Sequence, residues 1–150
     1  MNTLRLALAL VAVTLLVPVL GAPVLAREIE PAERREHDYE ARLPPCDHPA
    51  VTADIMSDFE TRESRFWNSS LRIVQFDRIR QLAWRPWGLD YIPRRFCSGT
   101  VLTSDGVKRR VDYSVREDLG TIGITWGTEW CVTGLDRHYA FAPACRQARP

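Results

Sequence analysis

The chain has 150 residues, a formal net charge of +1, 45% hydrophobic residues and 26% charged residues. This composition is typical of one folded domain, and it excludes a collagen-like chain, a wholly disordered chain and a multi-span membrane protein. The balance of charges also argues against a nucleic-acid binder, which normally carries an excess of basic residues on one face.

The N-terminus has the pattern of a secretory signal peptide. Arg5 precedes the apolar run Leu6–Leu20, and Val24 and Ala26 suit the −3 and −1 positions of a cleavage site. We therefore predict a signal peptide over residues 1–26, cleaved after Ala26, and a periplasmic or secreted protein that meets the membrane only through this segment. The alternative is an uncleaved membrane anchor, but the apolar run is shorter than the roughly 20 residues that span a bilayer.

Residues 27–45 are predicted to form a charged, flexible leader. Ten of these 19 residues are Asp, Glu or Arg, and two prolines end the segment. Such a stretch buries too little apolar surface to offset the entropy lost on ordering it. A mobile linker is the simplest interpretation, and a tail that binds a partner is the alternative.

A single domain is predicted over residues 46–150, and it should begin with a helix. Asp47 or His48 is suited to cap this helix, and Pro49 is suited to its first turn. Apolar side chains then recur at helical spacing, at Val51, Ile55, Phe59 and Phe66. The pattern predicts a helix from Pro49 to Phe66 or Trp67, with these side chains facing a core.

Four strands are predicted after the helix, over residues 71–83, 94–103, 108–116 and 122–133. The first contains a change of phase in its apolar residues, which indicates a bulge or a bend. The segment 84–88 should break this strand, and Ser104-Asp105-Gly106-Val107 has the composition of a hairpin turn. In the last strand, one face is expected to carry Ile124, Trp126, Trp130 and Val132.

One helix followed by an antiparallel meander predicts an α+β domain of two layers. The helix should pack across one face of a four-stranded sheet. The commonest architecture of this kind is cystatin-like, so we expect a cystatin-like arrangement here.

All four cysteines, Cys46, Cys97, Cys131 and Cys145, lie in the predicted domain. An even number of cysteines in an exported chain favours two disulfides over free thiols or a metal site. Cys46 and Cys97 should lie at the same end of the sheet, whereas the second and fourth strands are about 9.5 Å apart, beyond the reach of a disulfide. Of the three possible pairings we prefer Cys46–Cys97 with Cys131–Cys145.

The segment around residues 84–95 is the preferred binding surface. Tryptophan, tyrosine and arginine dominate binding hot spots, and this segment contains Trp84, Arg85, Trp87, Tyr91, Arg94 and Arg95. Pro86 and Gly88 favour a turn, so the whole loop is less easily buried. The alternative is that both tryptophans fold back onto the edge of the sheet.

Groups suited to catalysis are few. Glu129 and His138 are the candidate acid–base residues, because Glu129 lies between Trp126 and Trp130 and His138 should lie near strand ends. The plainer interpretation of Glu129 is an ion pair with an arginine of a neighbouring strand, such as Arg110. The sequence contains no phosphate loop, no nucleophile elbow and no pattern of metal ligands, so we expect no cofactor and no metal.

Seven segments resemble corresponding segments of a group of small exported proteins of alphaproteobacteria. The resemblance covers about residues 46–150, and it is carried by residues 46–51, 66–69, 92–97, 104–106, 126–132, 134–137 and 142–145. It implies a location in the bacterial envelope. It assigns no activity and no site residue.

The sequence thus favours an exported binding or interaction module. The partner would be an envelope protein or a small ligand, and no nucleic acid is expected. One alternative is a small cell-envelope enzyme that uses Glu129 and His138, and another is an inhibitor of an envelope hydrolase, suggested by analogy with the cystatin-like scaffold alone.

Intact-mass measurement on protein from a periplasmic extract tests export and disulfide formation together. We expect a chain that begins at Arg27, with no thiol available for alkylation before reduction and four available after it. A mass that retains residues 1–26, or two thiols that react without reduction, would contradict the prediction.

Overall fold

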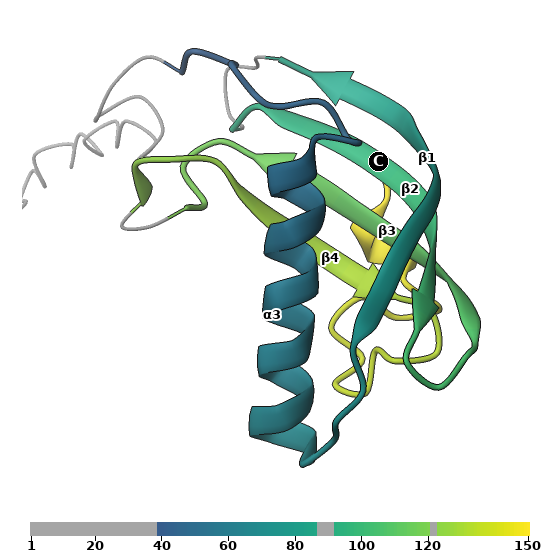
Figure 1. The fold of residues 1–150 in the computed structure, drawn as a ribbon. Helices are drawn as coiled ribbons and strands as arrows, with labels where there is room; N and C mark the ends of the chain where they lie inside the picture. The colour runs from purple at the N-terminus through teal and green to yellow at the C-terminus, as the bar shows by residue number, and fades with distance from the viewer. Residues whose placement is uncertain (1–38, 87–91, 121–122) are drawn as a thin grey trace, which may run out of the picture. The chain divides into compact units, whose positions relative to one another are not determined.

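The computed structural model describes residues 39–86, 92–120 and 123–150. Figure 1 shows helix α3 (Pro49–Trp67) lying across one face of a sheet. The sheet is an antiparallel meander in the order β1 (Ile73–Arg85), β2 (Arg94–Thr103), β3 (Lys108–Arg116) and β4 (Gly127–Val132). A short 3-10 helix, η2 (Arg146–Ala148), follows. The predicted α+β architecture of two layers is confirmed.

Helix α3 begins as expected. His48 is the N-cap, and its Nδ1 accepts a hydrogen bond from the Ala50 N–H at 3.2 Å. Val51, Ile55 and Phe59 are buried against the sheet. The prediction for Phe66 was wrong, because its side chain is 63% exposed. Residues four apart lie on one side of a helix, and the position that continues the buried side after Phe59 is therefore residue 63.

Glu63 takes that buried position. It is only 3% exposed, and its carboxylate forms an ion pair with Arg137 at 3.1 Å. A buried carboxylate needs a cationic partner, and here the partner comes from the segment that follows β4. Periodicity of apolar residues alone could not reveal this pairing, since Arg137 is distant in the sequence.

Strand β1 contains the predicted irregularity, in three places. Its register against β2 shifts between Ile73 and Gln75, between Asp77 and Arg80, and again before Ala83. The predicted break at residue 84 was wrong. The strand continues to Arg85 because residues 83–85 pair with residues 94–96 of β2.

Strands β2 and β3 have the predicted bounds, whereas β4 is shorter than predicted. The chain turns back on itself before β4, where the Gly120 N–H donates to the Thr125 carbonyl oxygen at 2.7 Å. Ile124 was expected to share a face with the tryptophans, but it lies in this turn and is 75% exposed. Trp130 is buried against Phe59 of the helix, with ring centroids 5.6 Å apart.

The helix and the sheet enclose the main core. We call the sheet surface under α3 the helix face, and the opposite surface the outer face. Val111, Tyr113 and Val115 of β3 are fully buried on the helix face. Burial raises the pKa of the Tyr113 hydroxyl, which donates to the Cys46 carbonyl oxygen at 2.8 Å.

Both preferred disulfides are confirmed. Cys46–Cys97 joins the start of the helix to β2, and Cys131–Cys145 joins β4 to the C-terminal segment. The second disulfide lies on the outer face, where Arg149 forms an ion pair with the fully buried Asp112 at 3.0 Å. The C-terminal segment therefore covers part of the outer face.

Residues 39–45, which we assigned to the leader, contact the sheet in the structure. The N–H groups of Glu40 and Ala41 each donate to the Glu117 carboxylate at 2.8 Å, and Leu43 is buried in the main core. Among the described residues, no helix is long and apolar enough to cross a membrane.

Candidate functional site

The predicted binding surface is divided between the two faces of the sheet. Trp87 and Tyr91 lie outside the described residues. Trp84 and Arg95 pair across β1 and β2 on the helix face, with the Arg95 guanidinium 4.3 Å from the Trp84 ring centroid. Arg95 also donates to the Leu43 carbonyl oxygen at 3.3 Å. Trp84 and Arg95 therefore help to hold residues 39–45 on the core.

Arg85 and Arg94 face the other way. Arg85 pairs with Arg94 in the register of β1 and β2, and Arg94 pairs with Arg116 in the register of β2 and β3. Side chains directly opposite in a sheet point to the same face. The three arginines therefore form one line across the outer face, which we call the arginine row.

The arginine row brings like charges together. Burial lowers the pKa of Arg94 and the neighbouring charges of Arg116 and Arg85 lower it further, while Glu129 acts in the opposite direction. Like charges directly opposite on neighbouring strands destabilise a sheet. In the protein without a ligand, the arginine row therefore carries more positive charge than the nearby carboxylates neutralise.

Two guanidinium groups of the row also contain a nitrogen atom without a hydrogen-bond partner. Among the described residues, the buried Nε atoms of Arg94 and Arg116 have none. Arg95 shares this property on the helix face, but there the Trp84 ring covers the guanidinium. An unsatisfied buried donor on a functional surface is a candidate for contact with a ligand.

An aromatic ring lies beside the row. Phe96 is buried on the outer face next to Arg94, and the Arg85 guanidinium lies 5.4 Å from its ring centroid. In the same line across the sheet as Phe96 are Ser114 and Glu129. The ring restricts Arg85 through a cation–π contact.

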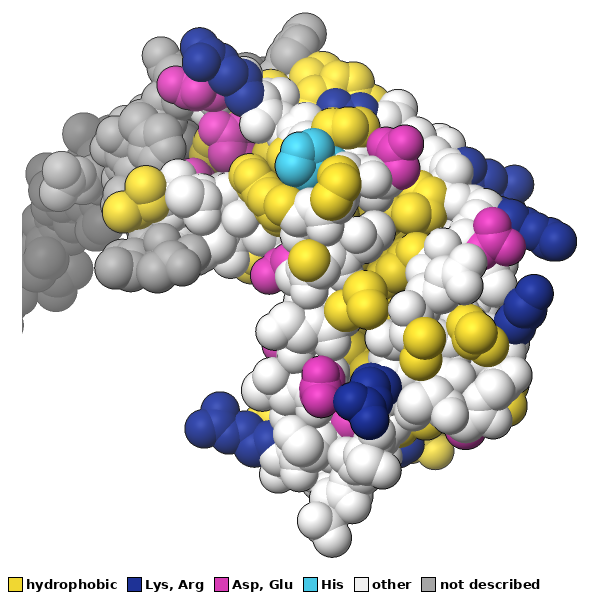
Figure 2. All heavy atoms as spheres, in the orientation of Figure 1, with side chains coloured by type: hydrophobic (Ala, Val, Ile, Leu, Met, Phe, Trp, Pro, Cys, Tyr) yellow, Lys and Arg dark blue, Asp and Glu magenta, His cyan; other side chains and the backbone are white. Residues whose placement is uncertain are grey.

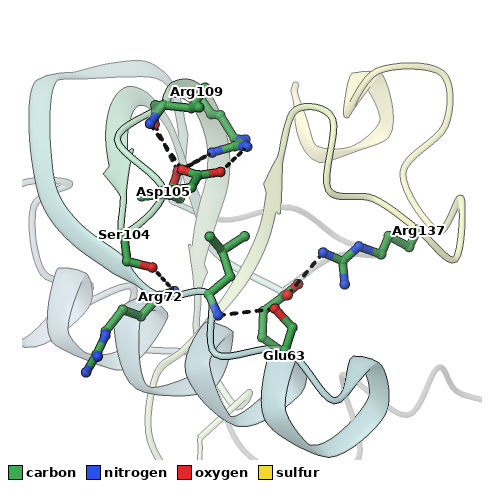
Figure 3. Close-up of polar contacts among 10 residues, drawn as sticks. Glu63, Arg72, Ser104, Asp105, Arg109 and Arg137 are labelled. Atoms are coloured by element: carbon green, nitrogen blue, oxygen red, sulfur yellow. Dashed lines mark hydrogen bonds and ion pairs between the residues drawn. The ribbon is translucent and has the colours of Figure 1, made fainter.

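Several other arginines, among them Arg62, Arg109 and Arg137, have carboxylate partners close by. Figure 3 shows Arg109 reaching Asp105 of the hairpin turn and Arg137 reaching Glu63 of the helix. The Arg109 hydrogen bonds hold the pKa of Asp105 well below its usual range. These pairs give their arginines a structural role, whereas within the described residues no ion pair involves Arg85, Arg94 or Arg116.

Glu129 is half-buried on the outer face and acts electrostatically on Arg94. The suggested pairing with Arg110 is wrong. Arg110 donates through Nε and Nη2 to Asp112 at 3.0 and 2.8 Å, which leaves Glu129 to the arginine row.

His138, the other catalytic candidate, lies elsewhere. Its ring packs on Trp67 at the end of α3, with centroids 4.7 Å apart, and the Arg137 guanidinium lies 5.1 Å from the Trp67 ring centroid on the same side of the domain. Because α3 covers the helix face and Glu129 points to the outer face, the structure does not bring the two candidates together.

Arg116 was missed by the analysis of the sequence. In residues 111–116, Asp112, Ser114 and Arg116 alternate with apolar residues, a pattern typical of side chains that point away from a core. What was missing was the register that places Arg116 opposite Arg94. Register depends on pairing between distant segments, so no local pattern contains it.

No group of three or more His, Cys, Asp or Glu side chains suited to a metal ion occurs within the described ranges. Comparisons of the chain with protein-family models, with curated proteins and with solved structures found no match. The case for function therefore depends on the geometry of the site.

Replacing Glu129 tests the electrostatics of the site. Glu129→Gln removes the carboxylate that favours charged Arg94, so we expect it to lower the free energy of unfolding by about 0.2–1 kcal/mol. Because salt screens such interactions, the loss should shrink as NaCl rises from about 0.02 M to about 1 M. Urea denaturation measures both values.

The control is Glu60→Gln, which removes an equal charge from an exposed position on α3. It should have little effect at either salt concentration. Equal stability losses for the two variants would show that Glu129 has no specific relation to the arginine row.

Proposed function

We propose that this protein is an exported binding module that holds an anionic group of its partner or ligand on the arginine row. The observation that carries the proposal is the alignment of Arg85, Arg94 and Arg116 on one face of the sheet. A sheet without a ligand is destabilised by such a row. A bound anion would remove the repulsion and supply hydrogen-bond acceptors.

A carboxylate is the group that suits the row. Guanidinium groups present parallel N–H donors that match the two oxygens of a carboxylate, and such bonds are about twice as strong as neutral ones. Phe96 is buried and restricts the Arg85 guanidinium, so the charged groups of the row would make the contacts with the carboxylate. Glu129 would repel any ligand that approaches from its side.

Export belongs to the same proposal. Two disulfides persist in an oxidising compartment such as the bacterial periplasm. The signal-peptide pattern of residues 1–26 and the resemblance to small exported proteins support the same location. The natural partner would then be an acidic surface of an envelope protein or a small carboxylate.

A fluorescent hexaglutamate peptide tests the proposal in a defined system. We expect the double variant Arg94→Gln/Arg116→Gln to weaken binding at least about tenfold, the effect of losing roughly 1.4 kcal/mol of charge-assisted hydrogen bonding. Fluorescence anisotropy at low ionic strength measures the change in affinity. Circular dichroism should show that this double variant stays folded.

The matched control is Arg65→Gln/Arg72→Gln, which removes the same net charge from exposed positions outside the arginine row. It should change the affinity by less than about twofold, since distant exposed charges are largely screened. If both double variants weaken binding equally, the peptide senses net charge only and the proposal fails.

A further inference from the structure

The bulge in the middle of β1 has an unusual residue in its strained position. Arg78 and Ile79 lie opposite the single residue Gly99 of β2. Arg78 has a φ of 52°, in the left-handed region that favours glycine and asparagine. A side chain other than glycine in this region costs on the order of 1 kcal/mol, and such strain occurs preferentially at functional sites.

Gly99 makes this bulge possible. A Cβ added at Gly99 would lie 3.3 Å from the Asp77 carbonyl oxygen and 3.4 Å from Ile79 Cγ1. The missing side chain leaves room for Ile79, which packs against the main core. With Ile79 turned toward the helix face, Arg78 and Arg80 both line a pocket on the outer face.

The pocket has a volume of about 280 Å³. Its lining consists of three arginines, two hydroxyl side chains and one glycine: Arg78, Arg80, Arg110, Ser98, Thr100 and Gly99. Ser98 is only 3% exposed and lies at the base of the pocket. Figure 2, which views the domain from the side of α3, shows several Lys and Arg side chains projecting at its right-hand edge.

Positive charge exceeds negative charge around this pocket. Arg110 and Arg149 share the buried carboxylate of Asp112. Arg78 reaches Asp77 only at 3.8 Å, with both side chains more than half exposed. In the described part of the chain, no ion pair involves Arg80. Arg110 uses Nε and Nη2 on Asp112, so its Nη1 remains for a ligand.

We propose that this pocket binds a tetrahedral oxyanion of the phosphate or sulfate type. Three guanidinium groups and two hydroxyls supply more donors than the two oxygens of a carboxylate accept, whereas the four oxygens of a tetrahedral anion can use them. Ser98 and Arg94 are four residues apart on β2, about 13 Å at the rise of a strand. The pocket is therefore distinct from the arginine row and does not depend on it.

Amide chemical shifts of the full chain test this site. Inorganic phosphate, added at constant ionic strength, should shift the amides of Ser98, Gly99 and Thr100 along a saturable curve. The double variant Arg78→Gln/Arg80→Gln should weaken this binding at least about tenfold. Arg94→Gln/Arg116→Gln is the matched control, and it should change the phosphate affinity by less than about twofold.

Three results would overturn the proposal. The first is the absence of saturable shifts, and the second is equal shifts with chloride. The third is an equal loss of phosphate affinity in the two double variants, which would place the anion on the arginine row instead. If the double variant fails to fold, Arg80→Gln alone decides the matter, because no ion pair of Arg80 in the described structure is lost with it.

Two further probes identify the source of the oxyanion. Glycerol phosphate represents a soluble phosphate monoester, and vesicles containing phosphatidic acid represent a lipid headgroup. Binding of either probe that Arg78→Gln/Arg80→Gln weakens supports the site and assigns its source. If inorganic phosphate binds and neither of these probes does, the ligand is the free anion. If none of the three binds while hexaglutamate still does, the pocket proposal fails and the proposed function of the arginine row stands.

Discussion

The Cys46–Cys97 disulfide determines which side chains of β2 face the helix. Cys46 precedes α3, so Cys97 must point toward the helix face. Successive side chains of a strand point to opposite faces, and Phe96 and Ser98 are therefore directed to the outer face. The bridge closes a loop whose ends are 51 residues apart, for which the chain-entropy treatment gives about 4 kcal/mol. That is a large share of the stability of a small domain.

Both proposed sites follow from this assignment of faces. With Cys97 inward, Arg94 points outward, and the register with β1 and β3 aligns it with Arg85 and Arg116. A slip of one residue would exchange the faces and bury the arginines under the helix. The bulge opposite Gly99 adds a local change, since it places two more arginines on the same outer face. The outer face is thus shaped by strand pairing and by one glycine.

Local patterns predicted the elements whose signals are local. The hairpin turn at residues 104–107 separated β2 from β3, and both strands have the predicted bounds. Topology combined with disulfide reach gave the correct pairing of the cysteines. The prediction that Phe66 faces the core was wrong because the buried side of α3 continues through Glu63. Glu63 is charged, so a hydropathy pattern does not identify it as buried. Glu63 is buried only because Arg137 neutralises it from a distant segment.

The candidate site contains only part of the predicted binding surface, and the cause again lies in pairing between distant segments. Arg85 and Arg94 were identified from composition, but their separation from Trp84 and Arg95 depends on the strand continuing to Arg85. The pocket beside the bulge could not be predicted, because the change of phase in β1 indicates a bulge without saying which side chains it redirects. The burial of Asp112 likewise depends on Arg149, near the end of the chain.

A crystal structure of the full chain grown with selenate would test the central claim most directly, because anomalous scattering from selenium locates each bound oxyanion. The account predicts selenate in the pocket lined by Arg78, Arg80 and Arg110 on the outer face, and none at the arginine row, which suits a carboxylate. Selenate bound only at exposed arginines outside this face, such as Arg65, or at the arginine row instead of the pocket, would contradict it.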